Sequence, residues 1–347
     1  MRKLMKLFLV LALLSLPVAG LAADQQELIG AGATFPYPLY SKMFDVYSKE
    51  YGVKVNYQAI GSGGGIRQLI NKTVDFGGSD AIMGEEEAKS AGAHVLHIPT
   101  CAGAVVVTYN LPGSPDIRLT PELIADVFLG KIKKWDDLRI AAANPGIKLA
   151  AVPITVVHRS DGSGTTNIFS DYLSKVSREW KEKVGAGTAL NWPVGLGAKG
   201  NPGVAGLVKQ TPGSFGYVEL IYALQNKMPY ATLRNRSGNF VRPTLVSTST
   251  AMNVTLPPDM KVSLTDTDAP EGYPIAGLTW ILVYREQGYQ GRSEAKAREL
   301  VRLLKWMTHE GQKYCEPMQY APLSKKAAER AEALIGSITY NGKGIMK

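Results

Sequence analysis

Strand-like and helix-like segments alternate along most of the chain, and this alternation restricts the fold more than any other feature of the sequence. Apolar residues recur at helical spacing from Tyr40 to Tyr47, and the residues from Val53 to Tyr57 then alternate like a strand. The same order returns where Ile154–Arg159 resembles a strand and Ile168–Leu173 follows helical spacing. This pattern predicts an α/β fold.

The first 22 residues have the features of an export signal. A positively charged start precedes the apolar run Leu7–Leu16, and Pro17 and the small residues Gly20 and Ala22 follow. The run is shorter than the roughly 20 residues that a membrane-spanning helix needs. We therefore expect cleavage after Ala22 and a soluble mature protein outside the cytoplasm.

Length and charge limit what the rest of the chain can be. About 325 residues follow the signal, which is more than one core usually holds, so two lobes are expected. Of 39 Lys and Arg residues, three lie in the signal, which leaves 36 against 30 Asp and Glu residues. These charges are scattered, and the one short basic cluster with an aromatic residue, Lys131–Trp135, is weak evidence for nucleic acid. We predict no nucleic-acid partner.

The chain has no pattern that predicts a metal site or a cofactor. Two cysteines and four scattered histidines lack the spacing of metal ligands. The segment from His309 begins like a zinc-protease helix, but Lys313 stands where the second histidine would be needed. An oxidising compartment would permit a disulfide between Cys101 and Cys315, and the sequence does not decide whether they meet.

Three glycine-rich segments, each leading into a helix-like one, carry chemistry suited to an oxyanion: Gly30–Pro38, Ile60–Ile66 and Arg159–Thr166. Glycine lets main-chain N–H groups approach a ligand closely, and a helix start offers unpaired N–H donors and a positive dipole end. Arg159 adds a guanidinium suited to oxyanions. The hydroxyl donors are Thr34, Ser62, Ser163 and Thr165. One such segment is typical of an N-capping turn, but three together predict a site for a tetrahedral oxyanion.

A fourth segment, Gly77–Ile82, contributes a carboxylate, Asp80. Phosphate keeps a proton near neutral pH and sulfate does not, so Asp80 would accept a hydrogen bond from phosphate and repel sulfate. A buried carboxylate left without its hydrogen-bond donor is costly, so a site of this kind can bind an ion of similar shape about 10⁴-fold or more weakly when that ion lacks the proton. The alternative is that Asp80 is a helix cap or a surface residue, as the charged Glu85–Glu87 nearby suggests.

Two further motifs suggest enzymes and lack essential parts. Gly195–Gly200 matches a dinucleotide fingerprint by its letters, but no clear buried strand precedes it and Pro202 should interrupt a helix, so we predict a loop. Ser163 is conceivable as a nucleophile with His158 as its base. Strand alternation places His158 on the face opposite Arg159, and no nucleophile elbow is present, so we predict that the chain is not an enzyme.

The chain resembles the periplasmic phosphate-binding proteins of high-affinity phosphate ABC importers. The resemblance covers nearly the whole mature chain and is weakest at residues 235–272, which we expect to form loops and turns. The matching segments occur in the family's order and are Gly30–Pro36, Ser79–Asp80, Leu129–Asp137, Arg159–Thr165 and Asn191–Asn201.

The resemblance implies a two-lobe periplasmic binding protein fold, type II-like, with a hinge of two crossover strands near Cys101–Ala104 and Pro274–Gly277. The first lobe would comprise residues 23–101 and 276–347, and the second lobe residues 102–275. It also implies a monomer that closes over inorganic phosphate and delivers it to ABC transporter permease subunits at the inner membrane.

The resemblance further assigns roles to single residues. Asp80 would accept the phosphate proton, and Asp161 would hold Arg159 in place. Family members often have a second serine after the position of Ser62, whereas this chain has Gly63. The implied phosphate donors are Thr34, Phe35 through its backbone, Ser62, Arg159, Ser163, Gly164 and Thr165.

Three other functions remain open from the residues themselves. The nearest is a binding protein for another oxyanion, such as sulfate, molybdate or arsenate. The second is a secreted phosphatase that uses Ser163. The third is an adhesion or scaffolding protein that binds no phosphate.

Overall fold

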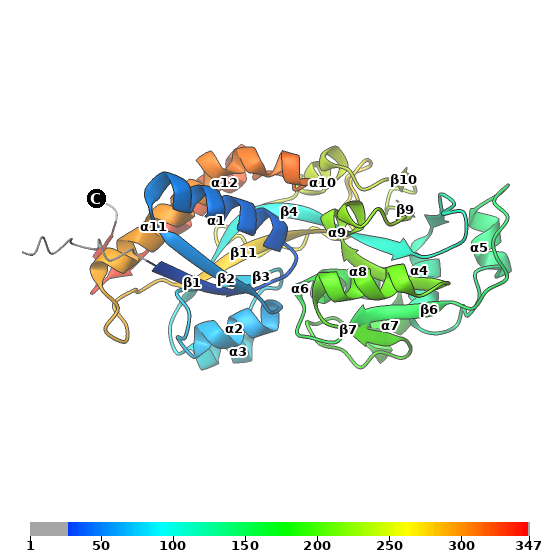
Figure 1. The fold of residues 1–347 in the computed structure, drawn as a ribbon, viewed down its shortest axis with the longest axis horizontal. Coiled ribbons are helices and arrows are strands. Elements are labelled where there is room, and N and C mark those ends of the chain that lie inside the picture. The colour runs from blue at the N-terminus through cyan, green and yellow to red at the C-terminus, as the bar shows by residue number, and fades with distance from the viewer. Residues whose placement is uncertain (1–26, 346–347) are drawn as a thin grey trace, which may run out of the picture.

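The structure is a computed structural model that describes residues 27–345, so the predicted signal peptide lies outside the described residues. Helices and strands alternate through most of the chain, as the sequence predicts (Figure 1). The main sheet contains β1 (Glu27–Gly32), β2 (Lys54–Ala59), β3 (Phe76–Ser79), β4 (Val95–Tyr109), β6 (Thr155–Arg159), β7 (Leu196–Ala198), β8 (Ser214–Glu219) and β11 (Ala276–Tyr284).

Besides the main sheet, the described chain contains longer and shorter helices and two small sheets. The longer helices are α1 (Tyr37–Tyr51), α2 (Ser62–Ile70), α4 (Pro121–Phe128), α6 (Gly164–Val176), α8 (Gly200–Gln210), α11 (Glu294–Thr308) and α12 (Lys325–Gly336). The shorter elements are α3 (Glu85–Ala91), β5 (Arg118–Leu119), α5 (Leu138–Ala143), α7 (Arg178–Lys183), α9 (Leu220–Gln225), β9 (Thr232–Arg234), β10 (Phe240–Val241), α10 (Leu245–Ala251), η1 (Glu310–Tyr314), η2 (Glu316–Met318), β12 (Thr339–Tyr340) and β13 (Lys343–Gly344).

The strand order of the main sheet is β2-β1-β3-β11-β4-β8-β6-β7, and the central strand β4 joins its two halves. Its first part, Val95–Ala104, pairs with β11, and its second part, Val105–Tyr109, pairs with β8. Strands β2, β1, β3 and β11, together with helices α1, α2, α3, α11 and α12, form the first lobe. Strands β8, β6 and β7 with α4, α6 and α8 form the second (Figure 1).

The directions of the strands bring one edge of each lobe toward the other. Strands β1, β2 and β3 are parallel, and β11 runs antiparallel to both β3 and β4, so β3 and β4 point the same way. Strand β8 is antiparallel to β4 and parallel to β6, which is parallel to β7. The carboxyl ends of the parallel strands in the first lobe therefore face those in the second, which is where α/β sheets usually bind ligands.

The central strands β4 and β11 are buried along their whole length, but the sequence predicts only part of β4. All residues of β4 and β11 are buried, and strands covered on both faces read as continuous apolar runs. The sequence predicts a strand only from Val105, because His97, Pro99 and Thr100 break the apolar run in the first part of β4. The helical spacing of Leu300, Leu303, Leu304 and Met307 predicts a long amphipathic helix over Ser293–His309, and the structure confirms it as α11, with these four residues buried.

Two predictions of irregular structure are wrong in part. Gly195–Gly200 is not a simple loop, because Leu196–Ala198 forms the edge strand β7 and helix α8 starts at Gly200. Pro202 does not interrupt this helix, since a proline in the first turn gives up no intrahelical hydrogen bond. The stretch of residues 235–272 is largely irregular, as predicted, but contains the helix α10.

The two cysteines are buried and unbonded, which answers the question that the sequence leaves open. Cys101 lies in β4, and Cys315 lies between the short helices η1 and η2. Burial raises the pKa of Cys315 to about 12 and that of Cys101 well above its ordinary value, so both thiols stay protonated near neutral pH. Within residues 27–345, no helix is long and apolar enough to cross a membrane.

The glycine cluster after β2 proves to be the first turn of helix α2, so its glycines serve packing as well as the turn. A Cβ atom on Gly65 would lie 2.5 Å from the carbonyl oxygen of Ala31 and 2.5 Å from Cα of Gly32. Helix α2 can therefore lie directly against β1 only because residue 65 lacks a side chain. This close approach places Ser62, the first residue of the helix, at the end of the sheet.

We predict opposite effects for alanine at two helical glycines. Gly65→Ala should lower the free energy of unfolding by about 3 kcal/mol, at the upper end of overpacking costs, because the clash is with backbone. Gly206→Ala in α8 should raise it by about 0.5–1 kcal/mol, because no atom lies within 4 Å of the added Cβ and alanine favours helix. Urea unfolding measures both values. Equal effects at both sites would contradict the packing described for α2.

Candidate anion-binding site

Four helices begin where the facing strand ends of the two lobes meet. In the first lobe, β1 leads into α1 and β2 leads into α2, and in the second lobe, β6 leads into α6 and β7 leads into α8. Each helix start carries main-chain N–H groups without intrahelical partners and the positive end of the helix dipole. The region between the lobes is therefore favourable for a negative charge before any charged side chain is considered.

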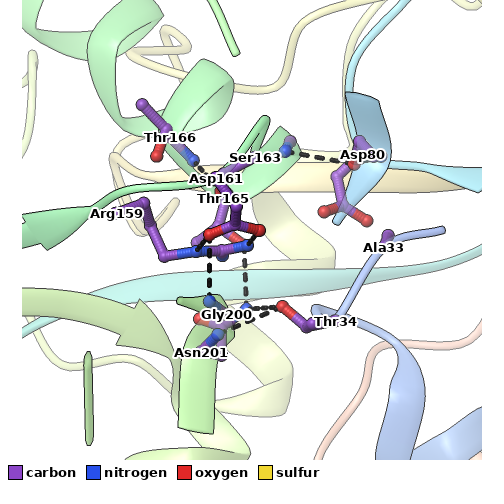
Figure 2. A network of polar contacts seen from close by, with 12 residues as sticks. Ala33, Thr34, Asp80, Arg159, Asp161, Ser163, Thr165, Thr166, Gly200 and Asn201 are labelled. Atoms are coloured by element: carbon purple, nitrogen blue, oxygen red, sulfur yellow. Dashed lines mark hydrogen bonds and ion pairs between the residues drawn. The ribbon is translucent and has the colours of Figure 1, made fainter. Parts of the chain in front are cut away.

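The charged centre of this region is Arg159, the last residue of β6. Its side chain is 1% exposed, and its Nε and Nη2 atoms donate to Oδ1 and Oδ2 of Asp161 at 2.7 and 2.6 Å (Figure 2). The N–H of Gly200, at the start of α8, donates to the same Oδ1 at 2.9 Å. Burial alone would raise the pKa of Asp161, but these hydrogen bonds and the charge of Arg159 bring its pKa below the ordinary value.

One nitrogen of the guanidinium is left over. Nη1 of Arg159 is buried and has no hydrogen-bond partner within residues 27–345. An unmet donor on a buried charged group is costly, so such an atom requires an explanation. A bound anion between the lobes would supply the missing acceptor.

Ser62 bridges the two lobes and is oriented as a donor. Its Oγ accepts the N–H of Asp80 at 3.2 Å from the first lobe and the N–H of Gly164 at 3.1 Å from the second. A hydroxyl oxygen has two lone pairs. Because both are occupied by N–H groups, the hydroxyl of Ser62 can act further only as a donor, and the Asp80 carboxyl is one acceptor within its reach.

Asp80 is not a surface residue or a helix cap, which excludes the alternative considered from sequence. It is 2% exposed, and its Oδ1 accepts the hydroxyl of Thr279 at 2.8 Å. Burial raises the pKa of Asp80 to about 7. The hydrogen bonds from Thr279 and Ser62 and the positive charge of Arg159 lower this pKa but do not outweigh the effect of burial. Near neutral pH this carboxyl group therefore lies close to the midpoint of its titration.

Thr34 and Thr165 come from opposite lobes and meet through Asn201. Both hydroxyl oxygens accept hydrogen bonds from the Asn201 side chain, at 3.0 Å each. The carbonyl oxygens of Thr34 and Phe35 are held at 2.6 Å by the hydroxyls of Tyr222 and Tyr320. The β1–α1 turn is thus fixed from both sides.

The structure brings all nine predicted residues into this one region, but the predicted donor group of one of them, the N–H of Gly164, is already used within the protein. The Oγ of Ser163 accepts the N–H of Thr166 at 3.0 Å, as the N-cap of α6. The N–H of Gly164 donates to the Oγ of Ser62 and is therefore not free to donate to a ligand. The predicted roles of all nine residues toward phosphate stay predictions, with Asp80 as the acceptor and Asp161 as the partner of Arg159.

Sequence reasoning missed several residues that build the site. Thr279 lies in the buried strand β11, where nothing in the pattern distinguishes a polar side chain that faces the site. Gly200 and Asn201 lay in a segment that the glycine spacing marked as a loop. The hydroxyl of Tyr217, which contacts the Thr166 hydroxyl at 2.6 Å and accepts the N–H of Arg159 at 3.3 Å, sits in a run that reads as core.

The site has the chemistry of an anion site and not of a metal site. Arg159 supplies a permanent positive charge, and the groups around it are mainly N–H and O–H donors. In the described part of the chain, no cluster of three or more His, Cys, Asp or Glu side chains could hold a metal ion.

Comparison with known proteins agrees with this chemistry. A family model described as a PBP superfamily domain matches residues 17–310. The phosphate-binding protein PstS of Xylella fastidiosa strain 9a5c is 44% identical over 314 residues, which cover 88% of this chain and 84% of that protein. The chain belongs to the PstS family of phosphate-binding proteins. PstS of Pasteurella multocida is 41% identical over 319 residues, covering 90% and 91% of the two chains.

Solved structures share the fold at lower sequence identity. The high affinity periplasmic phosphate-binding protein PfluDING, solved with bound phosphate, gives a TM-score of 0.72 at 21% identity, over 89% of this chain and 93% of that one. The phosphate-binding protein from Stenotrophomonas maltophilia gives 0.69 at 18% identity, over 89% and 93%. These likenesses confirm the two-lobe binding protein fold that the sequence predicts for this PstS family member.

The raised pKa of Asp80 predicts a pH-dependent stability of the ligand-free protein. Below about pH 4, Asp80 is protonated in the folded and the unfolded states alike, so the group has no effect. Between about pH 4 and 7 the unfolded chain releases the proton and the folded protein retains it, so stability falls as pH rises. Asp80→Asn, which stays neutral, should match the wild-type melting temperature at pH 4 and exceed it at pH 8.

The control for this experiment is Asp45→Asn, which changes an exposed carboxylate on α1. It should leave the pH dependence of the melting temperature unchanged. The decisive quantity is the difference in melting temperature between Asp80→Asn and the wild type. If this difference is the same at pH 8 as at pH 4, the burial of an ionisable group at residue 80 is contradicted.

Proposed function

We propose that this protein binds inorganic phosphate between its two lobes and delivers it to an ABC-type permease. Membership of the PstS family supports the proposal, because the relatives are named phosphate-binding proteins and the PfluDING structure contains bound phosphate. The single observation that carries it is the unpartnered Nη1 of the buried Arg159. A small tetrahedral anion is the ligand that would meet this atom together with the hydroxyl groups around it.

The donors proposed to hold the anion come from both lobes. The first lobe offers the hydroxyls of Thr34 and Ser62 and the N–H of Phe35, which makes no hydrogen bond within residues 27–345. The second lobe offers Nη1 of Arg159 and the hydroxyl of Thr165. These donors would replace the water molecules that hydrate phosphate, and their positions are set before the ion binds.

We propose that residues 23–101 with 276–347 and residues 102–275 move as the two lobes, and that β4 and β11 act as the hinge. Two observations support this division. Strand β4 changes its partner from β11 to β8 after Ala104, and outside these strands the lobes touch through short polar contacts such as Gly63 N–H to the carbonyl of Gly162 at 3.0 Å. The structure would then correspond to the closed form, and opening would expose the donors to solvent.

Asp80 is proposed to select a protonated anion. Its carboxylate would accept a hydrogen bond from the phosphate O–H, and its Oδ1 is already fixed by Thr279. Sulfate near neutral pH carries no hydrogen to donate, so its oxygen would face the carboxylate oxygen directly. This repulsion would distinguish two ions of nearly equal size.

We propose that the protein binds phosphate without chemical turnover. The groups that an enzyme would need are used otherwise: Ser163 Oγ caps α6, and the ring of His158 stacks on Trp192 at 4.7 Å. The periplasmic location, the monomeric state and the permease subunits as partners belong to the same proposal. The signal-like N-terminal sequence supports the location, and the PstS relatives support the permease partnership.

Arg159→Ala is the most direct test of the proposed site. Calorimetric titration of phosphate-free wild-type protein should show one phosphate site. The variant should bind at least about 100-fold more weakly, since hydrogen bonds to charged groups contribute roughly 1.5–3 kcal/mol each. The control Arg178→Ala removes an exposed guanidinium from α7 and should bind like wild type. An unchanged dissociation constant in Arg159→Ala would remove Arg159 from the site.

The role proposed for Asp80 predicts a change in selectivity. Wild-type protein should bind phosphate at least about 10⁴-fold more tightly than sulfate. In Asp80→Asn, where the carboxylate becomes an amide that can donate, this ratio should fall by at least about tenfold, because one repulsive contact is lost. Titrations with both ions at one pH measure the ratio. A ratio that survives the substitution would assign the selection to another acceptor.

A further inference from the structure

Asn201, the second residue of α8, is completely buried and uses every polar group it has (Figure 2). Its Nδ2 donates to the hydroxyl oxygens of Thr34 and Thr165, and its main-chain N–H donates to Thr34 Oγ1 at 3.1 Å. Its Oδ1 accepts the main-chain N–H of Glu219 at 2.9 Å. One side chain therefore connects two hydroxyls that belong to different lobes.

The orientation of the Asn201 amide is determined by the backbone. The N–H of Glu219 can only donate, so the atom that faces it must be the acceptor Oδ1. The NH₂ group then has to face Thr34 and Thr165, and it can only donate to them. The direction of both hydrogen bonds to the threonines follows from this one main-chain contact.

The amide in turn decides where the hydroxyl hydrogens point. Thr34 Oγ1 accepts two N–H groups of Asn201, which occupy both of its lone pairs. Thr165 Oγ1 accepts one. Neither hydroxyl can donate back to Asn201, and within residues 27–345 neither donates to any protein acceptor. Both hydrogens are left for a ligand between the lobes.

We propose that Asn201 is a positioning residue of the anion site, which makes donors of the Thr34 and Thr165 hydroxyls and ties the two lobes together in the closed form. This inference rests on the proposed function, because the anion is the acceptor toward which the hydroxyls turn. Without the amide, each hydroxyl is free to rotate and to accept, and a hydroxyl that accepts presents a lone pair to the anion.

The contact with Thr34 has a kinetic consequence. Thr34 lies in the first lobe and Asn201 in the second, so this contact has to break when the lobes separate. It stabilises the closed form without touching the path by which phosphate arrives. Loss of Asn201 therefore accelerates phosphate release and leaves the association rate nearly unchanged.

The experiment compares Asn201→Ala in two backgrounds, the wild type and the double variant Thr34→Val with Thr165→Val. Valine keeps the shape of threonine and removes the hydroxyl. In the wild-type background, Asn201→Ala should weaken phosphate binding by about 100-fold, since two hydrogen bonds to a charged ligand are disturbed. Without the two hydroxyls, the same substitution should cost less than about threefold, because Asn201 has nothing left to orient.

Stopped-flow measurements separate the two parts of the inference. In the wild-type background, the dissociation rate of phosphate should rise by at least about 30-fold and the association rate should change by less than about threefold. The matched control is Asn144→Ala. Asn144 is also buried and makes three side-chain hydrogen bonds, to the main chain of Arg118 and Ile140. The Asn144→Ala substitution should lower the melting temperature and leave phosphate binding unchanged.

The outcomes distinguish this inference from the proposed function. Wild-type protein that binds no phosphate refutes the proposed function. Wild-type protein that binds phosphate, with an equal loss on Asn201→Ala in both backgrounds, refutes the positioning role alone. Where Asn201→Ala does not fold, Asn201→Asp keeps the acceptor for Glu219. Its charge repels phosphate in both backgrounds, so the positioning role then requires a loss at least about tenfold larger where the hydroxyls are present.

Discussion

The ion pair between Arg159 and Asp161 is the interaction on which the anion site depends. A guanidinium that is 1% exposed is stable only with a charged partner, and Asp161 supplies it with two hydrogen bonds. Gly200 holds the carboxylate from a third direction, so β6, the turn after it and the start of α8 are fixed together. The remaining nitrogen is thereby held in place before a ligand arrives, and little conformational freedom is lost when one binds.

Around this pair, the hydroxyl groups are organised by the hydrogen bonds that they accept. Ser62 and Thr34 each receive two N–H groups, so each hydroxyl can act further only as a donor, through its hydrogen. The donors that occupy Ser62 come from both lobes. In the proposed mechanism, closing the lobes and preparing the donors are therefore one event.

The sequence predicts the components of the site better than their connections. Glycine-rich turns, Arg159 after a strand and Asp80 after another are visible in one dimension, because turn chemistry and strand alternation are local properties. Asn201, Thr279 and Tyr217 are not visible, because their roles arise from contacts with segments far away in the chain. The same limit explains the errors in the fold: the start of β4 is masked by three residues, and α8 by a glycine spacing that suggested a loop.

Strand β11 follows the entire second lobe in the chain, yet it pairs with β3 and completes the sheet of the first. Residues 102–275 are contiguous and contain all strands that β8, β6 and β7 need, whereas β3 keeps an uncovered edge until β11 is available. An uncovered strand edge is a template for pairing with other chains. We therefore expect the inserted lobe to fold ahead of the lobe that holds it, and we expect self-association to be a hazard before Ala276–Tyr284 has been synthesised.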